Sequence, residues 1–193
     1  TITTSSVAIQ PSTSQTFTLN GTNFVSIPIV EFVASTGAIT RASAVSFTSA
    51  TAISVTTNLA SGSYFIRVEN NDGNAVRSTN AILSSSISPT WSTAAGSLGT
   101  FAGDTSGTLA TVAATSDSTI TYSVTSGSSD LTSAGVSLNP STGALTTSDF
   151  GGSSTTATTY SFTITATDAE GQTADRAFSF TSSFGATGGG QFN

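Results

Sequence analysis

The stretch Tyr160-Ser161-Phe162-Thr163-Ile164-Thr165-Ala166 alternates large or apolar side chains with hydroxyl side chains along its whole length. Alternation with a period of two predicts a β-strand that buries one face and leaves the other in water. Asp168-Ala169-Glu170-Gly171 follows as a turn, and the next segment places Phe178 and Phe180 on one parity. These segments together predict an antiparallel hairpin with an apolar inner face and a hydroxyl outer face.

The same alternation recurs along the chain at intervals of about eight to twelve residues, which is typical of β-sandwiches. Apolar residues share one parity at Phe17 and Leu19, Val45 and Phe47, Ile53 and Val55, Tyr64 to Val68, and Ile120 to Val124. Turn residues separate these runs, as in Asn70-Asn71-Asp72-Gly73-Asn74 and Asn139-Pro140-Ser141-Thr142-Gly143. Helix-forming residues other than Ala are rare, so almost no helix is expected.

Serine and threonine replace charged residues on the predicted surface. The 193 residues include 36 Ser and 38 Thr but only 14 charged side chains, with a net charge of −6. Threonine is β-branched and favours strands. A hydrophobic fraction of 36% with so little charge differs from a disordered chain, which combines low hydrophobicity with high net charge. The composition therefore predicts a folded, all-β protein.

Ser84-Ser85-Ser86-Ile87-Ser88-Pro89 is predicted to connect two domains, because small polar residues followed by proline mark a short linker. The predicted domains are residues 1–86 and 87–184, each the length of one β-sandwich. Residues 185–193 are rich in glycine and predict a tail or linker. The chain starts at Thr1 inside a strand-like pattern, which predicts a processed or longer polypeptide.

Both halves resemble known immunoglobulin-like families. The first half resembles an IPT/TIG domain in Phe17-Thr18-Leu19-Asn20-Gly21-Thr22-Asn23-Phe24, Val30-Glu31-Phe32 and residues 62–73. The second half is similar to the bacterial and phage putative-Ig family, related to dystroglycan-type cadherin-like domains, in Ile120-Thr121-Tyr122-Ser123-Val124 and residues 136–145 and 160–171. The resemblances imply two tandem immunoglobulin-like antiparallel β-sandwiches that serve as spacers or binding modules on surface proteins.

The residues that are missing exclude several kinds of site. Without Cys, His or Lys, the chain cannot build a disulfide, a thiolate or histidine metal site, a Schiff base or an isopeptide cross-link. The acidic residues stand one by one in turns, so no catalytic carboxylate pair is predicted. We therefore expect no enzymatic activity and no cofactor.

Four separated Arg residues on an acidic chain cannot neutralise a nucleic-acid backbone, so no nucleic acid is expected as a partner. The most apolar stretch, residues 24–34, is interrupted by Pro28 and Glu31 and is far shorter than the ~20 residues that span a bilayer, so no membrane insertion is expected. Contacts with other subunits are expected to use strand edges and hydroxyl surfaces rather than charge.

Asp168, Glu170 and Asp175 form the strongest candidate cluster for a metal. The cadherin-like resemblance points to calcium between domains, but calcium needs six to eight oxygen ligands and the predicted linker contains no acidic residue. The cluster is therefore interpreted as an exposed acidic hairpin without metal. Residues 70–74 are interpreted as a hairpin turn, because they lack the distal Glu of a calcium loop.

Three aromatic residues are candidates for a contact surface. Phe65 has the parity opposite to Tyr64 and Ile66 and should point outward. Trp91, the single Trp, follows the linker and could pack between the domains or serve as an exposed ligand platform. Phe192 lies in the glycine-rich tail. Tyr64, Tyr122 and Tyr160 have core-facing parity and are expected to be buried.

Two functions remain open at this point. The first is a structural protein of a phage virion, such as a capsid decoration, neck or tail-appendage protein, located on the virion surface. The second is part of a bacterial surface adhesin or a secreted polysaccharide-binding protein. The expected partners are other virion or surface subunits in a homo- or hetero-oligomeric assembly, with host-surface glycans as a further class.

Overall fold

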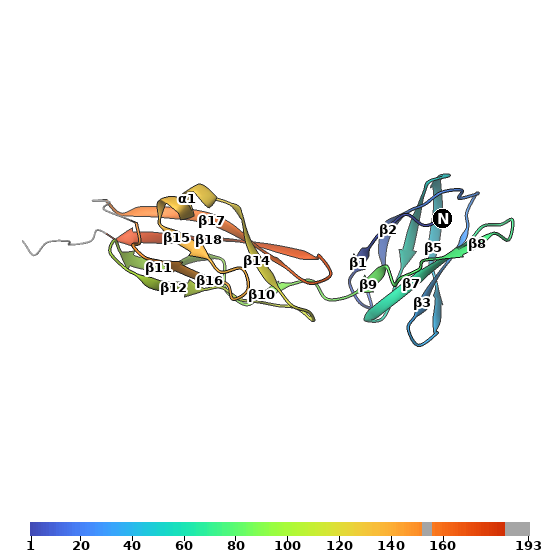
Figure 1. Ribbon diagram of the computed structural model, residues 1–193, viewed down its shortest axis with the longest axis horizontal. Coiled ribbons are helices and arrows are strands. Elements are labelled where there is room, and N and C mark those ends of the chain that lie inside the picture. Colours follow the sequence, from blue (N-terminus) through green and yellow to red (C-terminus); the bar gives the residue numbers. More distant parts are fainter. Residues whose placement is uncertain (152–155, 184–193) are drawn as a thin grey trace, which may run out of the picture. The chain divides into compact units, whose positions relative to one another are not determined.

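The computed structural model describes residues 1–151 and 156–183 (Figure 1). The chain forms two compact units, Thr1–Ile87 and a second that begins at Ser88. The division falls inside the predicted linker, but the first part of that linker is structured, because β9 (Leu83–Ser85) is a strand of the first unit.

The first unit is a sandwich of two sheets. One sheet has the order β1 (Val7–Ile9), β9, β7 (Gly62–Glu69), β3 (Ile29–Ala34) and β4 (Ile39–Arg41), with β8 (Ala75–Arg77) also paired to β7. The other has the order β2 (Gln15–Asn20), β6 (Ala52–Thr57) and β5 (Ala44–Ser49). Their inner faces share one core, in which the most deeply buried side chains are Leu19, Val30, Phe32, Ile53, Val55, Ile66 and Leu83.

The second unit repeats this architecture. One sheet has the order β11 (Gly96–Ala102), β18 (Thr173–Ser183), β17 (Thr158–Thr167) and β14 (Thr121–Ser126). The facing sheet has the order β12 (Gly107–Thr111), β16 (Ala144–Thr147) and β15 (Val136–Leu138), and β10 (Thr90–Trp91) pairs with β13 (Ala114–Thr115). The only helix among the described residues is the six-residue α1 (Ser128–Ser133), which agrees with the expectation of almost no helix.

The hairpin predicted from residues 160–180 is confirmed. Strands β17 and β18 pair antiparallel, with Tyr160 opposite Phe180 and Phe162 opposite Phe178, and all four rings are buried. On the outer face the hydroxyl oxygens of Thr159 and Thr181 lie 3.2 Å apart. The alternation in the sequence therefore separates an aromatic core face from a hydroxyl surface.

Two strand pairs differ from the expected antiparallel arrangement. Strand β1 pairs in parallel with β9, the last strand of its unit, and β11 pairs in parallel with β18, the last described strand of the second unit. All other strand pairs in residues 1–151 and 156–183 are antiparallel. Apolar–polar alternation is the same in both kinds of pair, so the pattern indicates strands but not their direction.

Candidate functional site

Trp91 lies in the core of the second unit, neither between the domains nor on an exposed platform. Its side chain is 8% exposed, and its ring centroid lies 5.4 Å from that of Phe178 and 5.8 Å from that of Tyr122. The indole N–H donates a hydrogen bond to the Ala174 carbonyl at 3.1 Å. A polar indole N–H that is satisfied inside the unit lets the ring serve as core material, and Trp91 therefore offers no contact surface.

The other aromatic candidates are placed as their parity predicts. Tyr64, Tyr122 and Tyr160 are all buried. Phe65 is half-buried on the outer face of β7, between the buried residues Tyr64 and Ile66. Phe192, together with the predicted tail, lies outside the described residues.

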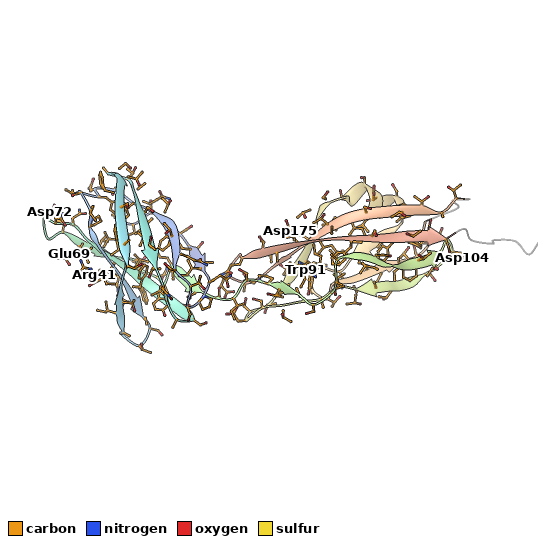
Figure 2. The ribbon with its side chains drawn as sticks, turned by 180° about the vertical axis from the view of Figure 1, so that it is seen from behind. Arg41, Glu69, Asp72, Trp91, Asp104 and Asp175 are labelled. Atoms are coloured by element: carbon orange, nitrogen blue, oxygen red, sulfur yellow. The ribbon has the colours of Figure 1, made fainter. Side chains whose placement is uncertain are left out.

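Phe65 belongs to a face that gathers three of the four Arg residues of the chain. In register, Arg77 of β8 lies opposite Arg67 of β7, which lies opposite Glu31 of β3, which lies opposite Arg41 of β4. These four side chains form one row across four neighbouring strands on the outer face of the sheet, which we call the arginine face together with Glu69 and Phe65. Arg41 and Glu69 lie on the same side of the first unit in Figure 2.

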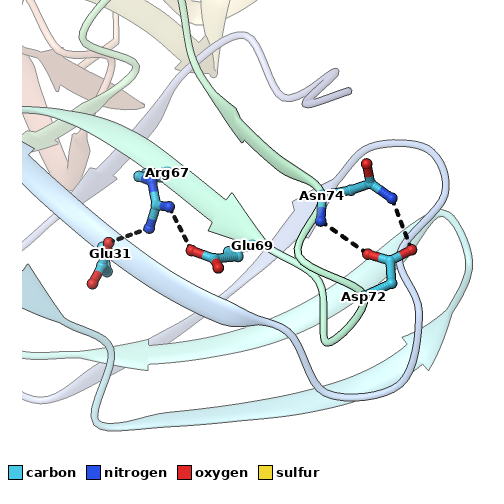
Figure 3. Close-up of polar contacts among 5 residues, drawn as sticks. All are labelled: Glu31, Arg67, Glu69, Asp72 and Asn74. Carbon is cyan, nitrogen blue, oxygen red and sulfur yellow. Dashed lines mark hydrogen bonds and ion pairs between the residues drawn. The ribbon is translucent and has the colours of Figure 1, made fainter.

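Arg67 is the centre of this face. Its guanidinium forms an ion pair with Glu31 at 2.7 Å and a second ion pair with Glu69, which is two residues further along the same strand (Figure 3). The hydrogen bonds that Arg67 donates to Glu31 and Glu69 raise the pKa of Arg67 above its usual value. One cation therefore pairs with both carboxylates of the face.

The two outer cations have different surroundings. The guanidinium carbon of Arg77 lies 4.6 Å from the centroid of the Phe65 ring, which is a cation–π contact. Arg41 is exposed on the edge strand β4 and forms no ion pair within the described residues. With three Arg and two Glu, the face carries a net charge of +1 (3 − 2).

The net charge of the chain is divided unequally between the two units. The first unit contains Glu31, Glu69 and Asp72 against Arg41, Arg67 and Arg77, a net charge of zero. The second unit contains seven acidic residues and one Arg, so its net charge is −6 (1 − 7). The Arg residues are separated in the sequence, but the strand register brings three of them into one row. The expectation that contacts use strand edges and hydroxyl surfaces rather than charge stays a prediction.

The candidate acidic cluster does not form a metal site. Asp168 is only 5% exposed, which corrects the expected exposed hairpin; its Oδ1 accepts a hydrogen bond from the Gln172 amide at 2.7 Å. Glu170 accepts a hydrogen bond from the Ser118 hydroxyl, and Asp175 accepts one from the Thr165 hydroxyl. Within the described residues, no group of three or more acidic side chains could hold a metal ion.

Asp168 Oδ2 is buried with no hydrogen-bond partner in the described part of the chain. One free carboxylate oxygen is far short of the six to eight oxygens that calcium requires. The residues present do not fit a calcium site of the kind that the cadherin-like resemblance implies.

Millimolar calcium is accordingly expected to leave the melting temperature of the protein unchanged, since an ion that does not bind the folded state cannot stabilise it. Differential scanning calorimetry with and without calcium, on the protein and on Asp168→Ala, makes the measurement. A rise of many degrees that is lost in Asp168→Ala would contradict this expectation.

The segment 70–74 is a tight hairpin, as predicted. The Asn70 amide donates to the Asn74 carbonyl at 2.9 Å, and Gly73 adopts φ of +83°. The Asp72 carboxylate accepts hydrogen bonds from the Asn74 backbone amide at 3.0 Å and from the Asn74 side-chain amide at 2.9 Å (Figure 3). These hydrogen bonds lower the pKa of Asp72 below its usual value.

A surface hollow of about 460 Å³ lies beside this hairpin, lined in part by Asn23, Asn70 and Asp72. The side-chain amide of Asn70 donates to the Asn23 carbonyl at 2.7 Å and accepts from the Val25 amide at 3.2 Å. The polar groups at this hollow thus hold two loops together, and the hollow is explained by loop packing.

The lowered pKa of Asp72 predicts a loss of stability at acidic pH. A carboxylate with a lower pKa in the folded state stabilises the fold above its unfolded pKa, near 3.8, and this contribution is lost as pH falls through the folded value. Thermal unfolding of the first unit should therefore depend less on pH below about 4 in Asp72→Asn than in the unmodified protein. Identical pH dependence in the two proteins would contradict the assignment.

No protein-family model matches this sequence, and no curated protein matches it. The IPT/TIG and putative-Ig resemblances therefore stay predictions. Among the described residues, no helix is long and apolar enough to cross a membrane.

Several cadherin structures are similar to this chain over more than nine tenths of its length. These include Drosophila N-cadherin EC1-4 (14% identity, TM-score 0.41, 92% of this chain and 47% of that one) and protocadherin gammaB7 EC3-6 (12%, 0.45, 94% and 49%). Human CDH23 EC21-23 is a third, with 16% identity and a TM-score of 0.41 over 92% of this chain and 66% of that one. The chain spans about half the length of the first two structures. A likeness at this level is uninformative about partners, metal binding or function.

Proposed function

We propose that this chain is a non-catalytic structural or adhesion module that assembles with other proteins on a surface. The proposal rests on the hydrogen bonds and ion pairs that the acidic side chains form within each unit. Asp168, Glu170 and Asp175 hold turns or neighbouring strands through hydrogen bonds, and Glu31 and Glu69 pair with Arg67. These five acidic side chains therefore hold turns and strands of the two sandwiches in place.

The finer proposal is a protein of the phage virion surface, as capsid decoration, neck or tail appendage. Its support is the resemblance of both halves to immunoglobulin-like modules of phage proteins and the low-charge Ser/Thr surface. The sandwiches would project from the particle, while one face or edge docks on a neighbouring subunit. A bacterial surface adhesin or secreted polysaccharide-binding protein, with host-surface glycans as ligands, is the alternative.

The full-length gene and its neighbours, together with mass spectrometry of purified virions and of washed host cells, distinguish the two. Adjacent capsid and tail genes and a stoichiometric presence in virions support the virion proposal. A signal peptide, many tandem repeats and a presence on cells instead support the adhesin and would overturn the virion role.

A further inference from the structure

Two guanidinium groups of the arginine face are available to a partner. Arg67 already pairs with Glu31 and Glu69, whereas Arg41 and Arg77 are exposed and form no ion pair within the described residues. They lie at opposite ends of a row of four strands, which is three inter-strand spacings of about 4.8 Å, or about 14 Å. The face therefore presents two separate positive charges around a centre whose net charge is −1 (1 − 2).

An apolar row runs beside this charged row. In register, Phe65 of β7 lies opposite Val33 of β3, which lies opposite Ile39 of β4. Ile39 is 61% exposed, and Val33 and Phe65 are half-buried. Arg and aromatic side chains are enriched where proteins bind one another, so apolar and cationic rows side by side are typical of a protein interface.

The charge that complements this face is on the same chain. The second unit has a net charge of −6. Four of its acidic side chains are exposed: Asp104, Asp117, Asp149 and Asp175. Its single cation, Arg176, donates a hydrogen bond to the Thr93 carbonyl at 2.7 Å. Figure 2 shows Asp104 and Asp175 at different places on this unit, so its negative charge is spread over its surface.

We propose that the arginine face docks on the acidic second unit of another copy of this chain. The inference rests on the proposed role as an assembling module and names the surface and the partner. The contact can be made twice in a reciprocal two-fold dimer or once per neighbour in a ring or open chain. A linear polyanion fits less well, because Glu31 and Glu69 lie between the free guanidiniums and repel a continuous line of negative charge, whereas carboxylates on a folded surface can reach Arg41 and Arg77 separately.

Sedimentation velocity of the full chain tests the proposal, with protein concentration varied at low salt and at about 1 M salt, where the Debye length is about 3 Å. We expect association at low salt that increases with concentration and is lost at high salt. The double variant Arg41→Gln/Arg77→Gln should weaken association by at least about fivefold, since two exposed charge pairs are removed.

A matched control distinguishes the loss of this contact from a general increase in repulsion between negatively charged copies. Thr18 and Ser46 are exposed on the outer face of the β2–β6–β5 sheet, both in register with Ser54. The variant Thr18→Glu/Ser46→Glu lowers the net charge by two, as the Arg variant does, and should associate within about twofold of the unmodified protein.

Three results would overturn the inference. They are a monomer at low salt at all concentrations, equal weakening in both variants, and a monomer that is retained on heparin through Arg41 and Arg77. Mass spectrometry of virions tests the virion role independently. If the chain is monomeric but present on virions, only this inference is overturned. If the chain associates in a salt-sensitive way but is absent from virions, only the virion role is overturned.

Discussion

Gly143→Ala is expected to lower the free energy of unfolding of the second unit by about 2–4 kcal/mol. Gly143 ends the turn that begins at Asn139, and its φ is +70°, in the left-handed region. A Cβ atom there would lie 2.1 Å from the Val112 carbonyl oxygen. That oxygen belongs to backbone, and the Val112 amide is itself bonded to the Gly143 carbonyl at 3.0 Å. The two segments would have to separate, which adds to the strain of the dihedral angle.

Gly171→Ala is the matched control for this prediction. Gly171 also ends a turn of the second unit and adopts φ of +84°, but a Cβ atom there meets nothing within 4 Å. Its cost is limited to the dihedral strain, about 1–2 kcal/mol. Denaturant unfolding followed by fluorescence of Trp91 reports the second unit directly, because this single Trp lies in its core. If the two variants lose the same free energy of unfolding, the close approach of Gly143 to the Val112 carbonyl does not limit which residue can stand at position 143.

Phe180→Ala is expected to cost the second unit about 3–5 kcal/mol, the range for removing a large buried ring. Phe180 is fully buried, and its ring centroid lies 5.7 Å from Phe101, 5.8 Å from Phe150 and 5.5 Å from Phe162. The aromatic rings of the two neighbouring strands, β11 and β17, and of the loop that carries Phe150 therefore meet on this side chain. Trp91 fluorescence in denaturant measures the loss.

Phe101→Ala provides the comparison, because Phe101 contacts the rings of Phe150 and Phe180 but is only half-buried. Phe101 buries less apolar area than Phe180, so Phe101→Ala should lower the free energy of unfolding clearly less than Phe180→Ala does. A loss of stability in Phe180→Ala that does not exceed the one in Phe101→Ala would contradict the central place of Phe180 in this core.

Local patterns were sufficient to predict the strands with clear alternation, but not short strands such as β4, β10 and β13. Alternation from Tyr160 to Ala166 and the parity of Phe178 and Phe180 predicted a hairpin that the structure confirms pair by pair. The turn residues at 70–74 and 139–143 predicted the observed turns, because their conformations depend on neighbouring residues only.

Properties that depend on distant residues could not be predicted in the same way. The arginine face exists because Arg41, Arg67 and Arg77 come into register on three strands, and no local pattern specifies which strands become neighbours. The sequence left two placements open for Trp91, between the domains or on an exposed ligand platform. Its burial in the core could not be predicted, because the acceptor of its indole N–H, the Ala174 carbonyl, is 83 residues away. Asp168 was expected to be exposed because turns usually are, whereas its carboxylate folds back on the Gln172 amide.

Cryo-electron microscopy of the intact particle shows directly whether the chain is a surface module docked on the virion. The expected map contains two β-sandwiches per copy on the outside of the particle, with the arginine face of one copy against the acidic second unit of its neighbour. A particle map in which no outer density accommodates these sandwiches, although the particles are complete and infectious, would contradict the virion-surface role.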